Sequence, residues 1–133
     1  MQKLNLIYYL LIGLFIFSAC SNNDDNESEL SVVGGWTVSE SKLNGEVVSD
    51  QSVIRLLTAD NRMEFRFLDE VDGNTELRIE KGNWTKDENI LKIDFDNADI
   101  GIKIYTITEL KDSSMTWESE ISGEGMLKES LIR

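Results

Sequence analysis

Residues 62–67 read RMEFRF, and this short stretch decides the fold class. Met63, Phe65 and Phe67 occupy alternate positions, and charged residues stand between them. Successive side chains of a β-strand point to opposite faces of its sheet, so the alternation predicts a strand with one buried and one solvated face. Half-buried strands of this kind are typical of antiparallel sheets.

Similar segments follow on both sides and are separated by turn signals about every 8–12 residues. Asn44-Gly45 and Asp72-Gly73 are dipeptides typical of tight hairpin turns. Strands are expected over residues 36–40, 53–58, 62–67, 75–85, 90–96, 100–110, 115–121 and 126–132. Only residues 50–57 also fit a helical spacing, and their β-branched pair favours a strand.

Two of these segments change their apolar parity, which predicts a local irregularity in each. Leu77 and Ile79 share one parity, whereas Trp84 has the other. A bulge at Gly82 would reset the register between them. A second bend is expected between residues 104 and 105 for the same reason.

About eight strands joined by sequential hairpins form an antiparallel up-and-down meander. Closing such a meander into a barrel removes its exposed strand edges, and this is the architecture we expect. A two-sheet β-sandwich is the alternative, because both architectures produce the same alternation along a strand.

Residues 1–19 have the features of a secretory signal peptide. Lys3 precedes an apolar run over residues 4–17, which as a helix would span about 21 Å, less than the roughly 30 Å hydrocarbon core of a membrane. Ser18-Ala19-Cys20 resembles the end of a bacterial lipobox. The resemblance implies thioether lipidation of Cys20, cleavage before it and acylation of the new amino terminus. An uncleaved amino-terminal anchor is the alternative.

Residues 21–29 read SNNDDNESE and contain no apolar side chain. Such a composition cannot bury enough surface to fold, so we expect residues 20–30 to form a flexible tether. Residues 31–133 then form one folded domain. An acidic run after a lipidated cysteine also resembles the surface-export tag of lipoproteins in some Gram-negative bacteria. An acidic spacer that holds the domain off the membrane is the alternative.

The composition excludes several classes of function. Lys and Arg number 13 against 25 Asp and Glu, and the net charge of −12 argues against nucleic-acid binding. The chain has no His and one Cys, so it lacks the commonest general base and a Cys-rich zinc site. Asp94, Asp96 and Asp99 lie close together, but Ala98 stands where an EF-hand loop needs an oxygen ligand. We therefore predict no metal, no cofactor and no enzymatic activity.

Several short motifs follow one another in a characteristic order. They are Gly34-Gly35-Trp36, Gly82-Asn83-Trp84, Asn89-Ile90-Leu91, Tyr105-Thr106-Ile107 and Glu109-Leu110. This order resembles the small lipocalin-like domains of bacterial lipoproteins, over about residues 30–133. The resemblance implies an eight-stranded barrel in which Gly34 and Trp36 lie at the closed end and Arg133 covers the tryptophan.

The aromatic and methionine residues on inward parity are the candidate ligand-binding residues. They are Met63, Phe65, Phe67, Trp84, Phe95, Tyr105 and Trp117. This set predicts either a pocket with flexible and aromatic walls or a barrel filled by its own side chains. The strand arginines are Arg55, Arg62, Arg66 and Arg78, and most of them are expected to pair with acids on the outer face. One turned inward could hold a carboxylate head group, and Arg66 and Arg78 are the candidates.

We expect a lipid-anchored, non-catalytic lipocalin-like binding protein for a small apolar or amphiphilic ligand. The lipid on Cys20 would attach it to the outer membrane of a bacterial envelope, with the domain facing the envelope or the cell surface. The alternative is a surface-presented protein-interaction or inhibitor module with a filled barrel. An internal cavity of a few hundred Å³ distinguishes the first function, and an exposed apolar patch the second.

Overall fold

The computed structural model describes residues 30–48 and 52–133, and this part of the chain forms nine β-strands and no helix. The strands are β1 (Gly34–Leu43), β2 (Glu46–Val48), β3 (Ser52–Leu57), β4 (Arg62–Val71), β5 (Asn74–Asp87), β6 (Ile90–Phe95), β7 (Ile102–Leu110), β8 (Ser114–Ile121) and β9 (Gly125–Ile132). The predicted signal peptide, Cys20 and nearly all of the predicted tether lie outside the described residues. The all-β prediction is confirmed.

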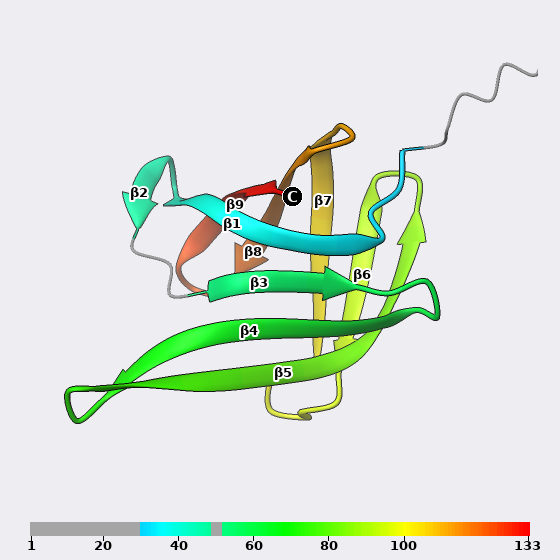
Figure 1. Ribbon diagram of the computed structural model, residues 1–133. Coiled ribbons are helices and arrows are strands. Elements are labelled where there is room, and N and C mark those ends of the chain that lie inside the picture. The colour runs from blue at the N-terminus through cyan, green and yellow to red at the C-terminus, as the bar shows by residue number, and fades with distance from the viewer. Residues whose placement is uncertain (1–29, 49–51) are drawn as a thin grey trace, which may run out of the picture.

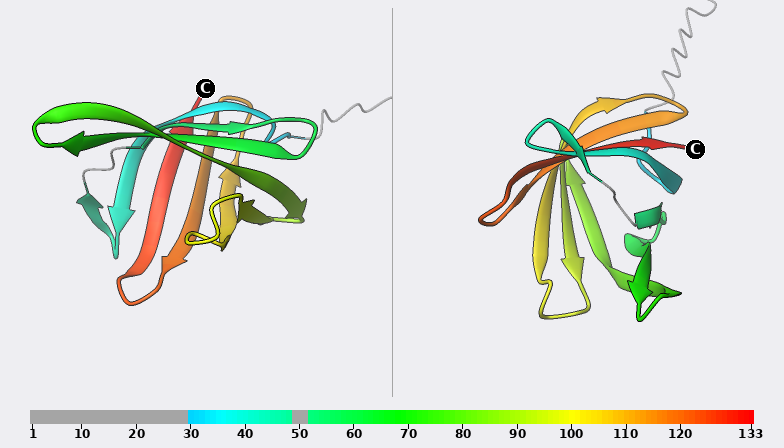
Figure 2. Two further views of the ribbon diagram at one scale, coloured as in Figure 1. Left: turned by 90° about the horizontal axis from the view of Figure 1, so that it is seen from below. Right: turned by 90° about the vertical axis from the view of Figure 1, so that its left-hand side faces the viewer.

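Eight strands close into a barrel (Figures 1 and 2). β1 and β3–β9 pair in chain order, each antiparallel to the next, and β9 returns to pair with β1. The short strand β2 pairs with the end of β1. The predicted closed meander is therefore confirmed, and the sandwich alternative is wrong because one continuous sheet closes on itself.

Gly82 lies on a continuous ladder, so the predicted bulge at this residue is wrong. β4 and β5 pair without a register shift along the whole of β4. Glycine at this position instead lets the backbones of β5 and β6 come close together, because an added Cβ would lie 2.3 Å from the main-chain oxygen of Asp94 on β6. Without a bulge, Leu77 and Ile79 remain on the outer face, where they are 57% and 42% exposed.

The predicted bend between residues 104 and 105 is also absent. β7 pairs with β6 in one register from Ile102 to residue 106. Ile102 and Ile104 therefore point outward, whereas Lys103 and Tyr105 point into the barrel. The register shifts occur elsewhere, one in each of the β1–β9, β3–β4 and β7–β8 pairs.

One end of the barrel is closed around Trp36, which is fully buried. Its indole Nε1 donates a hydrogen bond of 2.8 Å to the carbonyl oxygen of Val32. The guanidinium carbon of Arg133 lies 4.2 Å from the centre of the Trp36 ring, and Nη1 donates to the carbonyl of Val33 at 3.0 Å. Gly34 leaves room for this arginine, because an added Cβ would lie 3.0 Å from Nη1. The resemblance implied this arrangement.

The opposite end carries the turns over residues 44–45, 96–101 and 122–124. Asn44 joins two of them: its Nδ2 donates to the carbonyl of Glu124 at 2.8 Å, and its Oδ1 accepts from the amide of Met126 at 3.0 Å. β4 and β5 run on past their neighbours as a two-stranded ribbon (Figure 1). This end, called the open end below, is thus rimmed by turns, two of which Asn44 joins.

The buried apolar residues form one core between residues 32 and 131. The nine described strands belong to one hydrogen-bonded sheet. The described part of the chain has no helix that is long and apolar enough to cross a membrane.

Candidate functional site

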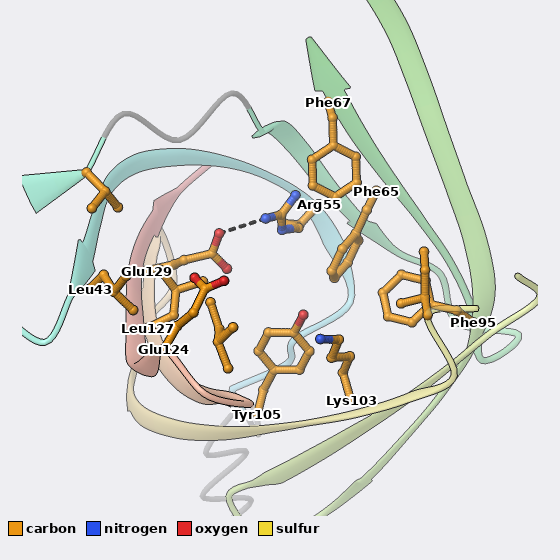
Figure 3. Close-up of a pocket in the computed structure, with 13 residues that line it drawn as sticks. Leu43, Arg55, Phe65, Phe67, Phe95, Lys103, Tyr105, Glu124, Leu127 and Glu129 are labelled. Carbon is orange, nitrogen blue, oxygen red and sulfur yellow. Dashed lines mark hydrogen bonds and ion pairs between the residues drawn. The ribbon is translucent and has the colours of Figure 1, made fainter. Parts of the chain in front are cut away.

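A cavity of about 380 Å³ occupies the open half of the barrel (Figure 3). Side chains from β1–β4, β6–β9 and two of the turns line it. They are Leu43, Val48, Arg55, Phe65, Phe67, Phe95, Ile100, Lys103, Tyr105, Ile121, Glu124, Leu127 and Glu129. Its volume lies within the range of about 300–1,000 Å³ that is typical of ligand pockets. The barrel is therefore not filled by its own side chains.

A buried ion pair forms the polar wall of the cavity (Figure 3). Nη2 of Arg55 on β3 donates to Oε1 of Glu129 on β9 at 2.6 Å. Nε1 of Trp117 on β8 donates to the other carboxylate oxygen, also at 2.6 Å. Arg55 is 4% exposed and Glu129 is 1% exposed. Three strands thus fix one carboxylate, since buried charges are tolerated only with such partners.

The rings of Phe65 and Phe67 also pack against the guanidinium of Arg55. The guanidinium carbon lies 4.3 Å from the ring centre of Phe65 and 5.0 Å from that of Phe67, distances at which a cation–π attraction operates. Phe65 in turn makes edge-to-face contacts with Phe95 and Tyr105, with centroid separations of 5.8 and 6.4 Å. The cavity walls are therefore held in place by neighbouring side chains.

Two further charged residues line the cavity. Lys103 on β7 is half-buried and stands directly opposite Ile93, which is fully buried. Figure 3 shows its amine and the hydroxyl of Tyr105 pointing into the cavity. Glu124 in the β8–β9 turn is exposed. Apolar walls together with charged groups suit an amphiphilic molecule.

The structure divides the predicted ligand-binding residues into three groups. Those that line the cavity are Phe65, Phe67, Phe95 and Tyr105. Those that are buried but outside the cavity lining are Met63, Trp84 and Trp117. Those that are more exposed and lie outside the lining are Arg66 and Arg78.

The two predicted arginines pair with acids and do not line the cavity, although the guanidinium carbon of Arg78 lies 4.2 Å from the ring centre of Phe67, which does. Arg66 pairs with Glu64 at 2.7 Å, and Arg78 pairs with Asp69 at 2.6 Å on the projecting ribbon. The hydrogen bond with Asp69 raises the pKa of the Arg78 guanidinium. Arg55 is the arginine that lines the cavity, because the register of β3 places it on the barrel interior. The expectation that one arginine turns inward therefore holds for Arg55, whereas the choice of Arg66 and Arg78 for that place is wrong.

Of the acidic residues Asp94, Asp96 and Asp99, Asp96 forms an ion pair with Arg62. Asp96 accepts a hydrogen bond of 2.8 Å from Nη2 of Arg62, and this contact lowers the pKa of the Asp96 carboxyl. Over residues 30–48 and 52–133, no three Asp, Glu, Cys or His residues lie close enough together to hold a metal ion.

A protein-family comparison places a known domain on this barrel. The family described as a lipocalin-like domain matches residues 32–117. No curated protein matches the chain.

Solved structures show the same fold at low sequence identity. A lipocalin-like protein from Bacteroides uniformis has 18% identity and a TM-score of 0.57, and the match covers 76% of this chain and 96% of that one. An uncharacterized protein from Bacteroides eggerthii has 14% identity and a TM-score of 0.57, over 77% and 99% of the two chains. The bovine lipocalin allergen Bos d 2 has 14% identity and a TM-score of 0.51, over 75% and 71%.

Proposed function

Because the chain belongs to the family of lipocalin-like domains, we propose that it is a non-catalytic binding protein for one small apolar or amphiphilic molecule. The cavity of about 380 Å³ carries this proposal. It is large enough for a ligand and near the lower end of the usual range, which favours a slim molecule.

The walls of the cavity suit the two parts of such a molecule. Phe65, Phe67, Phe95 and Leu127 offer apolar surface to a hydrocarbon chain. The charged residues of the lining offer hydrogen bonds to a polar end. Neither part requires a metal or a cofactor.

We also propose that the protein is anchored to the outer membrane of a bacterial envelope through a lipid on Cys20. The described chain enters the barrel at the closed end, beside Trp36, whereas the cavity lies at the open end. Residues 20–29 could reach at most about 33–36 Å if fully extended. A domain attached in this way would present the open end away from its attachment point and take its ligand from the surrounding solution.

An interaction with a partner protein is the second candidate function. Leu68 and Leu77 lie directly opposite each other on the projecting ribbon, and both are exposed. Exposed apolar side chains of this kind are a common feature of protein-binding surfaces.

Ligand titration of the barrel, residues 30–133, tests the proposed binding function. Trp117 touches Glu129 in the cavity wall, so tryptophan fluorescence should report occupancy. Fatty acids, fatty alcohols and retinoid-like compounds form the panel, and the binding proposal expects saturable quenching by at least one. Phe67→Arg should abolish it, whereas Leu68→Arg, the next residue on the outer face, should not. Circular dichroism checks that both variants fold.

The absence of saturable binding across the panel would contradict the proposed ligand function. The partner-protein candidate would then take its place. Quenching that requires calcium would contradict the metal-free part of the proposal.

A further inference from the structure

We infer that Lys103 selects the charge of the ligand, and that the ligand is an amphiphile with a carboxylate head group. This inference rests on the proposed function, because it needs the cavity to be occupied. It goes further by naming the head group and the residue that recognises it.

The register of β7 places Lys103 on the inner face of the barrel and its two isoleucine neighbours on the outer face. Lys103 pairs with Ile93, whose side chain is fully buried, and therefore shares the inner face with it. Ile102 and Ile104 flank the lysine and are 54% and 48% exposed. Hydrophobic burial alone would favour the opposite arrangement. Local rules are typically broken in this way at functional sites.

Within the described residues, Lys103 has no acidic partner, although acids outnumber bases in the chain 25 to 13. The other cation in the cavity lining, Arg55, is paired with Glu129. Lys86 and Lys92 also form no ion pair in the described chain, but both are exposed to water. Lys103 is therefore the half-buried ammonium of the described chain whose desolvation no ion pair offsets.

A carboxylate in the cavity would supply that missing charge. Figure 3 shows the Lys103 amine and the Tyr105 hydroxyl on the same side of the cavity. A carboxylate oxygen accepts a hydrogen bond from an ammonium, and charge strengthens that bond. The hydrocarbon chain of the ligand would then pack on Phe65, Phe67 and Phe95. Arg55 would keep its own carboxylate partner throughout.

The acidic residues in the lining do not favour a cationic ligand. Glu129 already accepts hydrogen bonds from Arg55 and Trp117. Glu124 lies in an exposed turn, where water and salt screen its charge. A cationic head group would also meet the like charge of Lys103.

The test compares three ten-carbon probes that differ only in their head groups: decanoate, decan-1-ol and decylamine. The full chain is reconstituted in phospholipid nanodiscs, and empty nanodiscs correct for partition of the probes into lipid. Affinities are measured by tryptophan fluorescence at neutral pH and low salt. The variants are Lys103→Met, Lys103→Arg and the matched control Lys92→Met, which removes an exposed lysine from the neighbouring strand.

We expect decanoate to bind about tenfold more tightly than decan-1-ol, the effect of one charge-assisted hydrogen bond. Lys103→Met should remove this preference and leave the affinity for the alcohol unchanged. Lys103→Arg should retain the preference, and Lys92→Met should have no effect.

Equal affinities for decanoate and decan-1-ol in the wild type would overturn the head-group assignment and leave the proposed function intact. A preference for decylamine would overturn it as well, as would a carboxylate preference that survives Lys103→Met. No saturable binding of any probe would instead overturn the proposed function itself.

Discussion

The ion pair between Arg55 and Glu129 provides the sharpest test of how the barrel is held together. Glu129→Leu removes a carboxylate that is 1% exposed and leaves the Arg55 guanidinium buried without this counter-charge. Breaking a buried pair on one side costs about 3–5 kcal/mol. The variant should therefore lose a large part of the free energy of unfolding, which is only about 5–15 kcal/mol for a typical domain.

Urea unfolding of residues 30–133, followed by circular dichroism, measures this loss. In thermal unfolding, the melting temperature of a domain of this size falls by about 4–8 °C per kcal/mol lost, so the variant should melt about 12–40 °C lower. The double variant Arg55→Met/Glu129→Leu should recover part of the stability, because it no longer buries an unpaired guanidinium. The recovery is incomplete, because Nε1 of Trp117 still lacks its carboxylate acceptor.

Glu118→Leu is the matched control on β8. Glu118 pairs with Lys128 on the outer face at 3.4 Å, and exposed pairs contribute about 0–1 kcal/mol. If Glu129→Leu is as mild as Glu118→Leu, the charges at Arg55 and Glu129 are reached by water, and the reasoning fails. It also fails if the double variant is no more stable than Glu129→Leu alone.

Three further predictions concern other parts of the molecule. Trp36→Ala should lower the free energy of unfolding by about 3–5 kcal/mol, and an unchanged melting temperature would contradict its place in the closed end. Cys20→Ala should release the protein from the membrane fraction of cells, and retention there would favour an uncleaved anchor. Arg62→Met should raise the pKa of Asp96 from its lowered value towards the ordinary value of an aspartate, as measured by NMR titration. Since the folded-state pKa is lowered, the contribution of this contact to stability is present above about pH 3.8 and disappears as the pH falls through the folded-state pKa.

The fold class could be predicted because the same local signals of strands and turns recur along the whole domain. Alternation over RMEFRF and turn dipeptides such as Asn44-Gly45 both report local backbone geometry, and the structure follows them. The predicted bulge at Gly82 failed because its argument assumed that apolar residues always face inward. Leu77 and Ile79 break that assumption on a ribbon that extends past the barrel.

The site was harder to predict for the same reason. Arg55 and Lys103 each stand between two apolar neighbours, Ile54 and Leu56 or Ile102 and Ile104. Parity alone assigns the apolar neighbours to the core and the charged residue to water. Only the register with the adjacent strand reverses the assignment, and register depends on pairing across the barrel. One signal in the sequence could have found them. Arg55 and Lys103 each stand two residues before a core residue of the same strand, Leu57 and Tyr105, and residues two apart on a strand share a face.

The two halves of the barrel divide stability and binding between them. The closed half holds fully buried apolar residues such as Trp36, Leu57 and Leu91, whose burial stabilises the fold. The open half places charged groups on the interior, where each must be matched by a partner or cost free energy. Arg55 has its partner within the chain, so its replacement should affect folding. Lys103 has no ion-pair partner in the described residues, so its replacement should affect binding, and the two kinds of variant separate the roles.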